Sequence, residues 1–130
     1  TANCSVCISD EPIGSPLILT PDILIAMNGP SYDKFINAVK PNGKVFIDST
    51  LVDSKCERTD IECFYIPSTE MADSNGLKGG SNMVLLGKLI KETNLFTFET
   101  MQKAVEKVVP PAKAKLIENN LRAIKMGMDY

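Results

Sequence analysis

The residues best suited to bind a ligand are uncharged polar side chains that follow apolar runs of the sequence. In an open sheet of parallel strands, ligands bind at the carboxyl ends of the strands, and side chains at such positions converge there. Their hydroxyl and amide groups can orient a ligand, but they are poor nucleophiles without a neighbouring base. Helix capping and turn formation explain the same residue types, so both interpretations stay open. The candidates are Asn28, Ser49, Thr50, Thr69 and Asn82, with Asp48, Ser68 and Glu70 beside them.

The chain contains no histidine and no tryptophan. It therefore lacks Ser-His-Asp and Cys-His catalytic groups, histidine-ligated zinc and imidazole acid–base chemistry. We name no catalytic residue and no metal ligand. This residue set favours a binding or assembly role over that of an enzyme acting alone.

The four cysteines are more typical of packed thiols than of a metal site. Cys4 and Cys7 form the one C-x-x-C pair, in a segment that alternates like a strand, where residues three apart point to opposite faces. Cys56 and Cys63 are seven positions apart, and the iron–sulfur spacing C-x2-C-x2-C does not occur. We expect core or half-buried thiols in a reducing compartment, with a metal site or a disulfide as the alternative.

A glycine-rich segment at residues 75–80 precedes a helical segment. The free N–H groups at the start of a helix can bind an anion, and Gly79, Gly80 and Ser81 lead into this one. The order of residues differs from the G-x-x-x-x-G-K-[ST] phosphate-binding loop, because Lys78 comes before the last two glycines. A flexible loop is the simpler interpretation, and anion binding is the alternative.

The 130-residue chain has the length of a single domain, which would span residues 1–130. It carries 14 basic and 16 acidic residues, and this net charge of −2 argues against nucleic acid or an anionic membrane as a partner. Its longest apolar runs are far shorter than the ~18–20 residues that span a bilayer, so we expect a cytoplasmic protein. The lysines at 103, 107, 113 and 115 predict a solvated face, with docking to an acidic partner as the weaker alternative.

The hydrophobic pattern predicts a domain of the α/β class with a largely parallel sheet. Strand, helix, turn and strand follow one another from residue 22 to residue 47, which is a βαβ unit with a right-handed crossover. The C-terminal helix is expected to bury Leu116, Leu121 and Ile124. Strands are predicted at residues 2–9, 22–27, 45–47 and 61–66. Helices are predicted at residues 31–39, from residue 67, at 82–91, from Thr97 or Thr100 to 109, and at 111–126.

Several short motifs stand in the order in which one protein family carries them. They are T-A-N-C-S-V at 1–6, I-G-S-P at 13–16, P-D-I-L-I-A-M-N at 21–28, Y-D-K-F at 32–35, V-K-P-N-G at 39–43, V-F-I-D-S at 45–49, I-P-S-T-E-M-A at 66–72, N-M-V-L-L-G at 82–87 and the segment 117–127. On these motifs the chain resembles the gamma subunit of 2-oxoacid:ferredoxin oxidoreductases. The resemblance implies a three-layer Rossmann-like domain with C-terminal helices.

Members of that family also carry a G-x-G-G-Q-G turn and an R-G-G stretch before T-A-N-C. Neither occurs here, so the chain resembles the C-terminal portion of such a subunit, truncated at its N-terminus. The missing segment would cover a sheet edge or an apolar surface.

The resemblance implies a role in the oxidative decarboxylation of a 2-oxoacid with coenzyme A, which yields an acyl-CoA, carbon dioxide and reduced ferredoxin. Alpha, beta and delta-type partner subunits would then hold thiamine diphosphate, Mg and the iron–sulfur clusters, and this chain would hold no cofactor of its own. It would assist assembly and help to hold coenzyme A at the candidate residues. The motifs at 1–6 and 13–16 favour 2-oxoglutarate or a branched-chain 2-oxoacid over pyruvate as the substrate.

Two other functions stay open. One is a stand-alone Rossmann-like module that binds a small molecule without catalysis, and such a module would be a stable monomer or homodimer. The other is a purely structural assembly subunit, in which the candidate side chains could be replaced without any effect on kinetics.

Overall fold

The computed structural model describes residues 2–130, which fold around a parallel sheet of three strands. The strands lie in the order β1 (Ile23–Ala26), β2 (Lys44–Asp48) and β3 (Glu62–Ile66). Ala26 pairs with Ile47, and Asp48 pairs with Ile66, so the three strands end at the same edge of the sheet. The predicted α/β class with a parallel sheet is confirmed.

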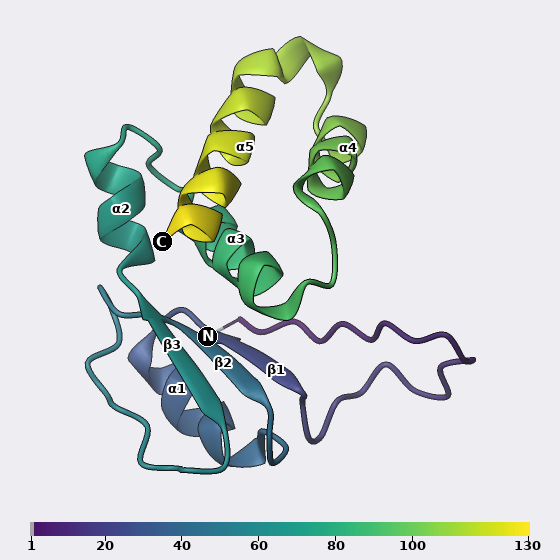
Figure 1. The fold of residues 1–130 in the computed structure, drawn as a ribbon, viewed down its shortest axis with the longest axis vertical. Coiled ribbons are helices and arrows are strands. Elements are labelled where there is room, and N and C mark those ends of the chain that lie inside the picture. Colours follow the sequence, from purple (N-terminus) through teal and green to yellow (C-terminus); the bar gives the residue numbers. More distant parts are fainter. Residues whose placement is uncertain (1) are drawn as a thin grey trace.

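Helices cover both faces of the sheet, which makes three layers (Figure 1). Val45 and Ile47 point to the face covered by the helix between β1 and β2, whereas Phe46 points to the opposite face and stacks on Phe64 at 4.9 Å between ring centroids. A strand buried on both faces must be apolar throughout, which explains the continuous run at residues 45–47. The helices are α1 (Gly29–Phe35) with the 3-10 turn η1 (Ile36–Ala38), α2 (Ser68–Ser74), α3 (Ser81–Thr93), α4 (Phe98–Val108), the 3-10 turn η2 (Pro111–Lys113) and α5 (Ala114–Asp129).

The backbones of α3 and α5 meet directly on one face of the sheet (Figure 1). Gly87 and Gly127 make this approach possible. A Cβ atom on Gly87 would overlap the carbonyl oxygen of Ile124, and a Cβ atom on Gly127 would overlap the carbonyl oxygen of Val84. The two glycines are therefore required by packing between helices rather than by backbone conformation.

The strand predicted at residues 2–9 is wrong. Residues 2–20 form an irregular arm that extends away from the sheet and returns to β1 (Figure 1). The side chains of Val6 and Ile8 are 67% and 72% exposed. Alternation of apolar and polar residues shows that a segment could form a strand. A strand also needs a neighbouring strand with which its backbone forms hydrogen bonds. No strand pairs with the arm among residues 2–130.

Two smaller differences concern helices. The helix predicted at residues 31–39 is split into α1 and η1, and Val39 is already extended. In α5, Leu121 is half-buried and Ile124 is buried as predicted, but Leu116 is 44% exposed. The apolar stripe of α5 runs through the buried Ile124 and the half-buried Ile117, Leu121 and Met128, and Leu116 lies one residue off this stripe.

The surface follows the predicted charge pattern. The lysines at 103, 107, 113 and 115 are all exposed, as expected of a solvated face. Within residues 2–130, no helix is long and apolar enough to cross a membrane.

Candidate functional site

A buried carboxylate lies at the carboxyl edge of the sheet. Asp48 is the last residue of β2, and none of its surface is exposed. Its carboxylate accepts hydrogen bonds from the Thr69 hydroxyl at 2.5 Å, from the Ser81 hydroxyl at 3.2 Å and from the backbone N–H of Thr50 at 3.0 Å. These bonds join the end of β2 to the first turns of α2 and α3.

Further hydroxyl groups extend this network. The Ser68 hydroxyl lies 2.9 Å from the Ser81 hydroxyl, and the Thr50 hydroxyl accepts a hydrogen bond from the backbone N–H of Glu70 at 3.1 Å. We call this group the strand-end cluster. Its members are Asp48, Thr50, Ser68, Thr69 and Ser81.

The strand-end cluster keeps Asp48 ionised. Burial by itself raises the pKa of the Asp48 carboxyl, because a charge is costly to remove from water. Hydrogen bonds from Thr69 and Thr50 stabilise the charged form and outweigh that effect, so the pKa lies below its usual range. At neutral pH the cluster is therefore built around a negative charge.

This lowered pKa predicts an acid-sensitive contribution to stability. Because the pKa of Asp48 is lower in the folded than in the unfolded chain, its stabilising effect is fully present above the unfolded value of about 4 and is lost as the pH falls through the folded value. We expect the Tm of the wild type to fall more steeply than that of Asp48→Asn as the pH is lowered below about 4. Parallel Tm curves for the two proteins would contradict this.

The structure brings two of the five candidate residues, Thr50 and Thr69, into the strand-end cluster. Ser49 is half-buried beside them, and its backbone N–H donates to the carbonyl of Ile66 at 2.9 Å. Their proximity agrees with convergence at the strand ends, while ligand contact stays a prediction.

The two candidate asparagines, Asn28 and Asn82, lie at the N-terminal ends of helices and accept hydrogen bonds from backbone N–H groups there. The exposed Asn28 side chain accepts from the backbone N–H of Ser31 at 2.9 Å and caps α1. The exposed Asn82 side chain accepts from the N–H of Met83 at 2.9 Å in the first turn of α3. For Asn28, the capping interpretation is confirmed.

The sequence did not connect Ser81 with Asp48. The two residues are 33 positions apart, and their contact at 3.2 Å exists only because α3 starts above the end of β2. The motif around Asp48 and the motif around Gly79–Ser81 can each be found in the sequence. No local pattern in the sequence shows that these two motifs are in contact in the fold.

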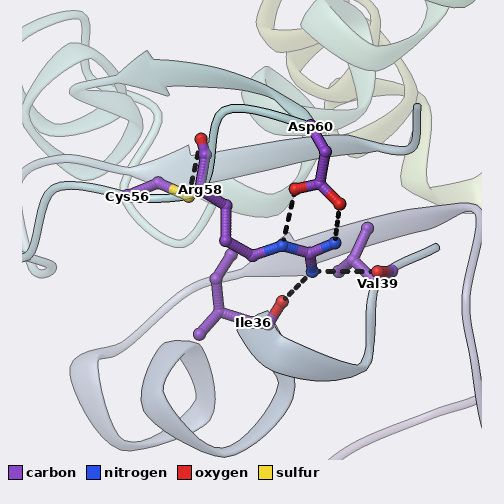
Figure 2. A network of polar contacts seen from close by, with 5 residues as sticks. All are labelled: Ile36, Val39, Cys56, Arg58 and Asp60. Carbon is purple, nitrogen blue, oxygen red and sulfur yellow. Dashed lines mark hydrogen bonds and ion pairs between the residues drawn. The ribbon is translucent and has the colours of Figure 1, made fainter. Parts of the chain in front are cut away.

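A second polar network surrounds Arg58 (Figure 2). Its Nε and Nη2 atoms donate to the two carboxylate oxygens of Asp60 at 2.9 and 2.7 Å. Its Nη1 atom donates to the carbonyls of Ile36 and Val39 at 2.8 and 2.9 Å. The guanidinium thus satisfies the carbonyls of the first residue of η1 and of the residue that follows η1, and four of its five N–H donors are used within the fold.

Because of this geometry, Arg58→Lys should lower the Tm measured by thermal denaturation. A lysine ammonium cannot reproduce the planar fork that binds Asp60 and the two carbonyls together. Arg122→Lys is the matched control, since Arg122 is exposed and the same change there should leave the Tm unchanged. Equal Tm values for the two variants would show that the Arg58 network does not stabilise the fold.

Thiols and phenols pack together on the α1 face of the sheet. The backbone N–H of Cys56 donates to the Tyr65 hydroxyl at 2.8 Å, and both residues pack against the same apolar cluster as Cys63. Burial raises the pKa of the Cys63 thiol to about 12, and it also raises the pKa of the Tyr32 phenol. These groups stay protonated at neutral pH, so Cys63 is an unreactive packing residue.

The prediction of core or half-buried thiols holds for three cysteines and is wrong for the fourth. Cys7, Cys56 and Cys63 are half-buried, and Cys4 is exposed because the arm has no neighbouring strand. All four are free thiols. In the described part of the chain, no three His, Cys, Asp or Glu side chains gather in a way that could hold a metal ion.

Two surface hollows lie away from the strand-end cluster. One, of about 420 Å³, lies between α1 and the segment 54–58. The other, of about 560 Å³, lies between α4 and α5 and is lined by apolar atoms of Phe98 and Leu121. The strand-end cluster lines neither hollow: Asp48 and Ser68 are buried, Thr69 and Ser81 are half-buried, and Thr50 is exposed.

The comparison with known protein families decides the classification. The family model described as pyruvate ferredoxin/flavodoxin oxidoreductase matches residues 1–130. The chain belongs to this family. The predicted resemblance to gamma subunits of 2-oxoacid:ferredoxin oxidoreductases is thereby confirmed.

The relatives of this chain include subunits of oxidoreductases that are named for different substrates. It is 36% identical over 126 residues to the 2-oxoglutarate synthase subunit KorC of Methanocaldococcus jannaschii, covering 95% of this chain and 66% of KorC. It is 32% identical over 130 residues to the ketoisovalerate oxidoreductase subunit VorA of Methanothermobacter thermautotrophicus, covering 100% of this chain and 27% of VorA. The chain thus spans just under two thirds of one relative and about a quarter of the other.

Solved structures of the family share the fold. The gamma subunit of a keto/oxoacid ferredoxin oxidoreductase from Geobacter sulfurreducens superposes with a TM-score of 0.72 at 28% identity, covering 83% of this chain and 62% of that subunit. The 2-oxoglutarate:ferredoxin oxidoreductase from Magnetococcus marinus, solved with 2-oxoglutarate, coenzyme A and succinyl-CoA bound, superposes with a TM-score of 0.73 at 22% identity, covering 85% of this chain and 19% of that chain. At that identity the second likeness concerns the fold alone.

Proposed function

We propose that this chain acts as a gamma-type subunit of a cytoplasmic 2-oxoacid:ferredoxin oxidoreductase. The complete enzyme would oxidatively decarboxylate a 2-oxoacid in the presence of coenzyme A and pass the electrons to ferredoxin. The family match over residues 1–130 carries this proposal, and the 36% identity to a 2-oxoglutarate synthase subunit supports it. Alpha, beta and delta-type subunits would complete the enzyme.

In this proposal the chain contributes assembly and part of a coenzyme A site rather than a reacting group. It has no histidine, and residues 2–130 gather no ligand set for a metal. Its residues do not suit iron–sulfur clusters or Mg-bound thiamine diphosphate, which we assign to the partner subunits. Within the strand-end cluster Thr50 is exposed and Thr69 is half-buried, so a ligand that contacted these two residues would be enclosed by a neighbouring subunit.

The names of two relatives support a choice of substrate. KorC is a subunit of a 2-oxoglutarate synthase, and VorA is a subunit of a ketoisovalerate oxidoreductase. We therefore propose 2-oxoglutarate or a branched-chain 2-oxoacid, ahead of pyruvate, as the substrate of the assembled enzyme.

Affinity capture of the tagged chain from its own cells, under anaerobic conditions, tests this function. The captured material is assayed for reduction of a viologen dye that depends on both coenzyme A and a 2-oxoacid, with 2-oxoglutarate, 2-ketoisovalerate and pyruvate compared. We expect activity to accompany the tag and pyruvate to be the slowest substrate. A chain that is captured alone and inactive would contradict the proposal and favour a stand-alone binding module.

A further inference from the structure

The hollow of about 560 Å³ between α4 and α5 is an open groove, which we call the α4–α5 groove. Its lining residues on α5 lie three and four positions apart, so they share one face of that helix. None of the lining side chains is fully buried. The residues of the two helices that line the groove are Phe98, Glu118, Leu121, Arg122, Lys125 and Met126.

The half-buried part of the α4–α5 groove is apolar. It is made by Phe98, Leu121 and Met126, and apolar atoms contribute most of the lining surface. The Nζ atom of Lys125 lies 5.6 Å from the centroid of the Phe98 ring, so this side chain extends along the aromatic ring. An apolar side chain from another polypeptide could cover this surface and remove it from water.

The exposed rim of the α4–α5 groove is positively charged. Within residues 2–130, the Arg122 guanidinium takes part in no hydrogen bond and no ion pair, and Lys125 forms no ion pair. Glu118 contributes the one carboxylate of the lining, and it lies 3.6 Å from the ammonium of Lys115, which offsets its charge. An exposed guanidinium with all of its donors unused is the complement of a carboxylate, which it can bind through two parallel hydrogen bonds.

We propose that the α4–α5 groove binds an acidic segment of a neighbouring subunit, which places an apolar side chain against Phe98 and a carboxylate against Arg122. This inference rests on the proposed function, which supplies the partner subunits, and adds a surface that holds the chain in the enzyme. A polypeptide fits this site better than a small molecule, because an open groove encloses little of a small ligand. The positive rim selects an acidic segment over a basic one.

Titration of the chain into an enzyme that lacks it tests this proposal. The remaining subunits are purified anaerobically from cells without the chain, and purified chain is added until coenzyme A-dependent viologen reduction is half restored. We expect Arg122→Glu to raise the half-restoring concentration at least about tenfold, because two carboxylates would then face each other. Arg122→Lys keeps the charge but loses the planar fork, and should raise it about threefold.

Lys103→Glu is the matched control for Arg122→Glu. Lys103 is exposed on α4 and does not line the groove, and its replacement changes the charge by the same amount. This variant should restore activity at the wild-type concentration. Both variants should keep the Tm of the wild type, since both side chains are exposed, so a shift in the titration reports docking rather than folding.

Other outcomes of the titration would overturn the inference. Equal half-restoring concentrations for the wild type and Arg122→Glu would do so and leave the subunit function standing, and equal rises for Arg122→Glu and Lys103→Glu would assign the effect to net charge. A purified chain that sediments as a dimer, or that floats with anionic vesicles, and loses this behaviour in Arg122→Glu would assign the groove to a second copy or to a membrane. A wild-type chain that restores no activity at any concentration would instead overturn the proposed function.

Discussion

Replacing Gly127 by alanine should lower the free energy of unfolding by about 3 kcal/mol, or prevent folding altogether. The new Cβ atom would overlap the carbonyl oxygen of Val84 on α3, which belongs to a rigid backbone and cannot rotate away. Overpacking in a core costs about 1–3 kcal/mol and more where the backbone must move. Gly87→Ala should have a similar effect through the carbonyl of Ile124.

Urea denaturation of the purified chain measures this loss, with Gly14→Ala as the control. A Cβ atom on Gly14 meets nothing within 4 Å, so that variant should keep the stability of the wild type. The double variant Gly87→Ala, Gly127→Ala should lose less than the sum of the two single losses, because one separation of α3 from α5 relieves both overlaps. Wild-type stability of Gly127→Ala would show that the two helices are not in direct backbone contact.

Replacing Asp48 by alanine should cost about 3–5 kcal/mol of stability. The change leaves the hydroxyls of Thr69 and Ser81 and the N–H of Thr50 without their acceptor, and each unsatisfied buried group costs about 1–3 kcal/mol. Some of that cost is recovered where the hydroxyls rotate toward one another or toward water.

The same denaturation measurement compares Asp48→Ala with Asp53→Ala. Asp53 is exposed and lies in the loop that follows β2, so its removal changes the charge equally without touching the strand-end cluster. We expect the Asp53 variant to stay close to the wild type. If the two variants lose stability equally, net charge rather than the cluster would explain the effect of Asp48.

The sheet was predictable because its strands are encoded locally. The apolar run at residues 45–47 and the turn before it place β2, and the helical spacing after Asn28 places α1. The arm at residues 2–9 has equally good strand spacing and is irregular, since no neighbouring strand bonds to it within residues 2–130. Local pattern thus predicts the capacity to form a strand, and the partner decides the outcome.

The position of the site could be predicted from the sequence, but the contacts between its residues could not. The rule that parallel strands end at one edge placed Thr50 and Thr69 near each other. The contact between Asp48 and Ser81 depends on where α3 begins, and the need for Gly127 depends on how closely α5 approaches α3. Both contacts join segments that are far apart in the sequence, and a single sequence contains no local pattern that predicts such contacts.

Removal and restoration of the chain tests its function most directly. The oxidoreductase complex is purified anaerobically from cells that lack this chain, and the purified chain is then added back before the viologen assay. We predict that coenzyme A-dependent oxidation of the 2-oxoacid is at background without the chain and is restored by wild-type protein but not by Gly127→Ala. Full activity in the absence of the chain would contradict its assignment as a functional subunit.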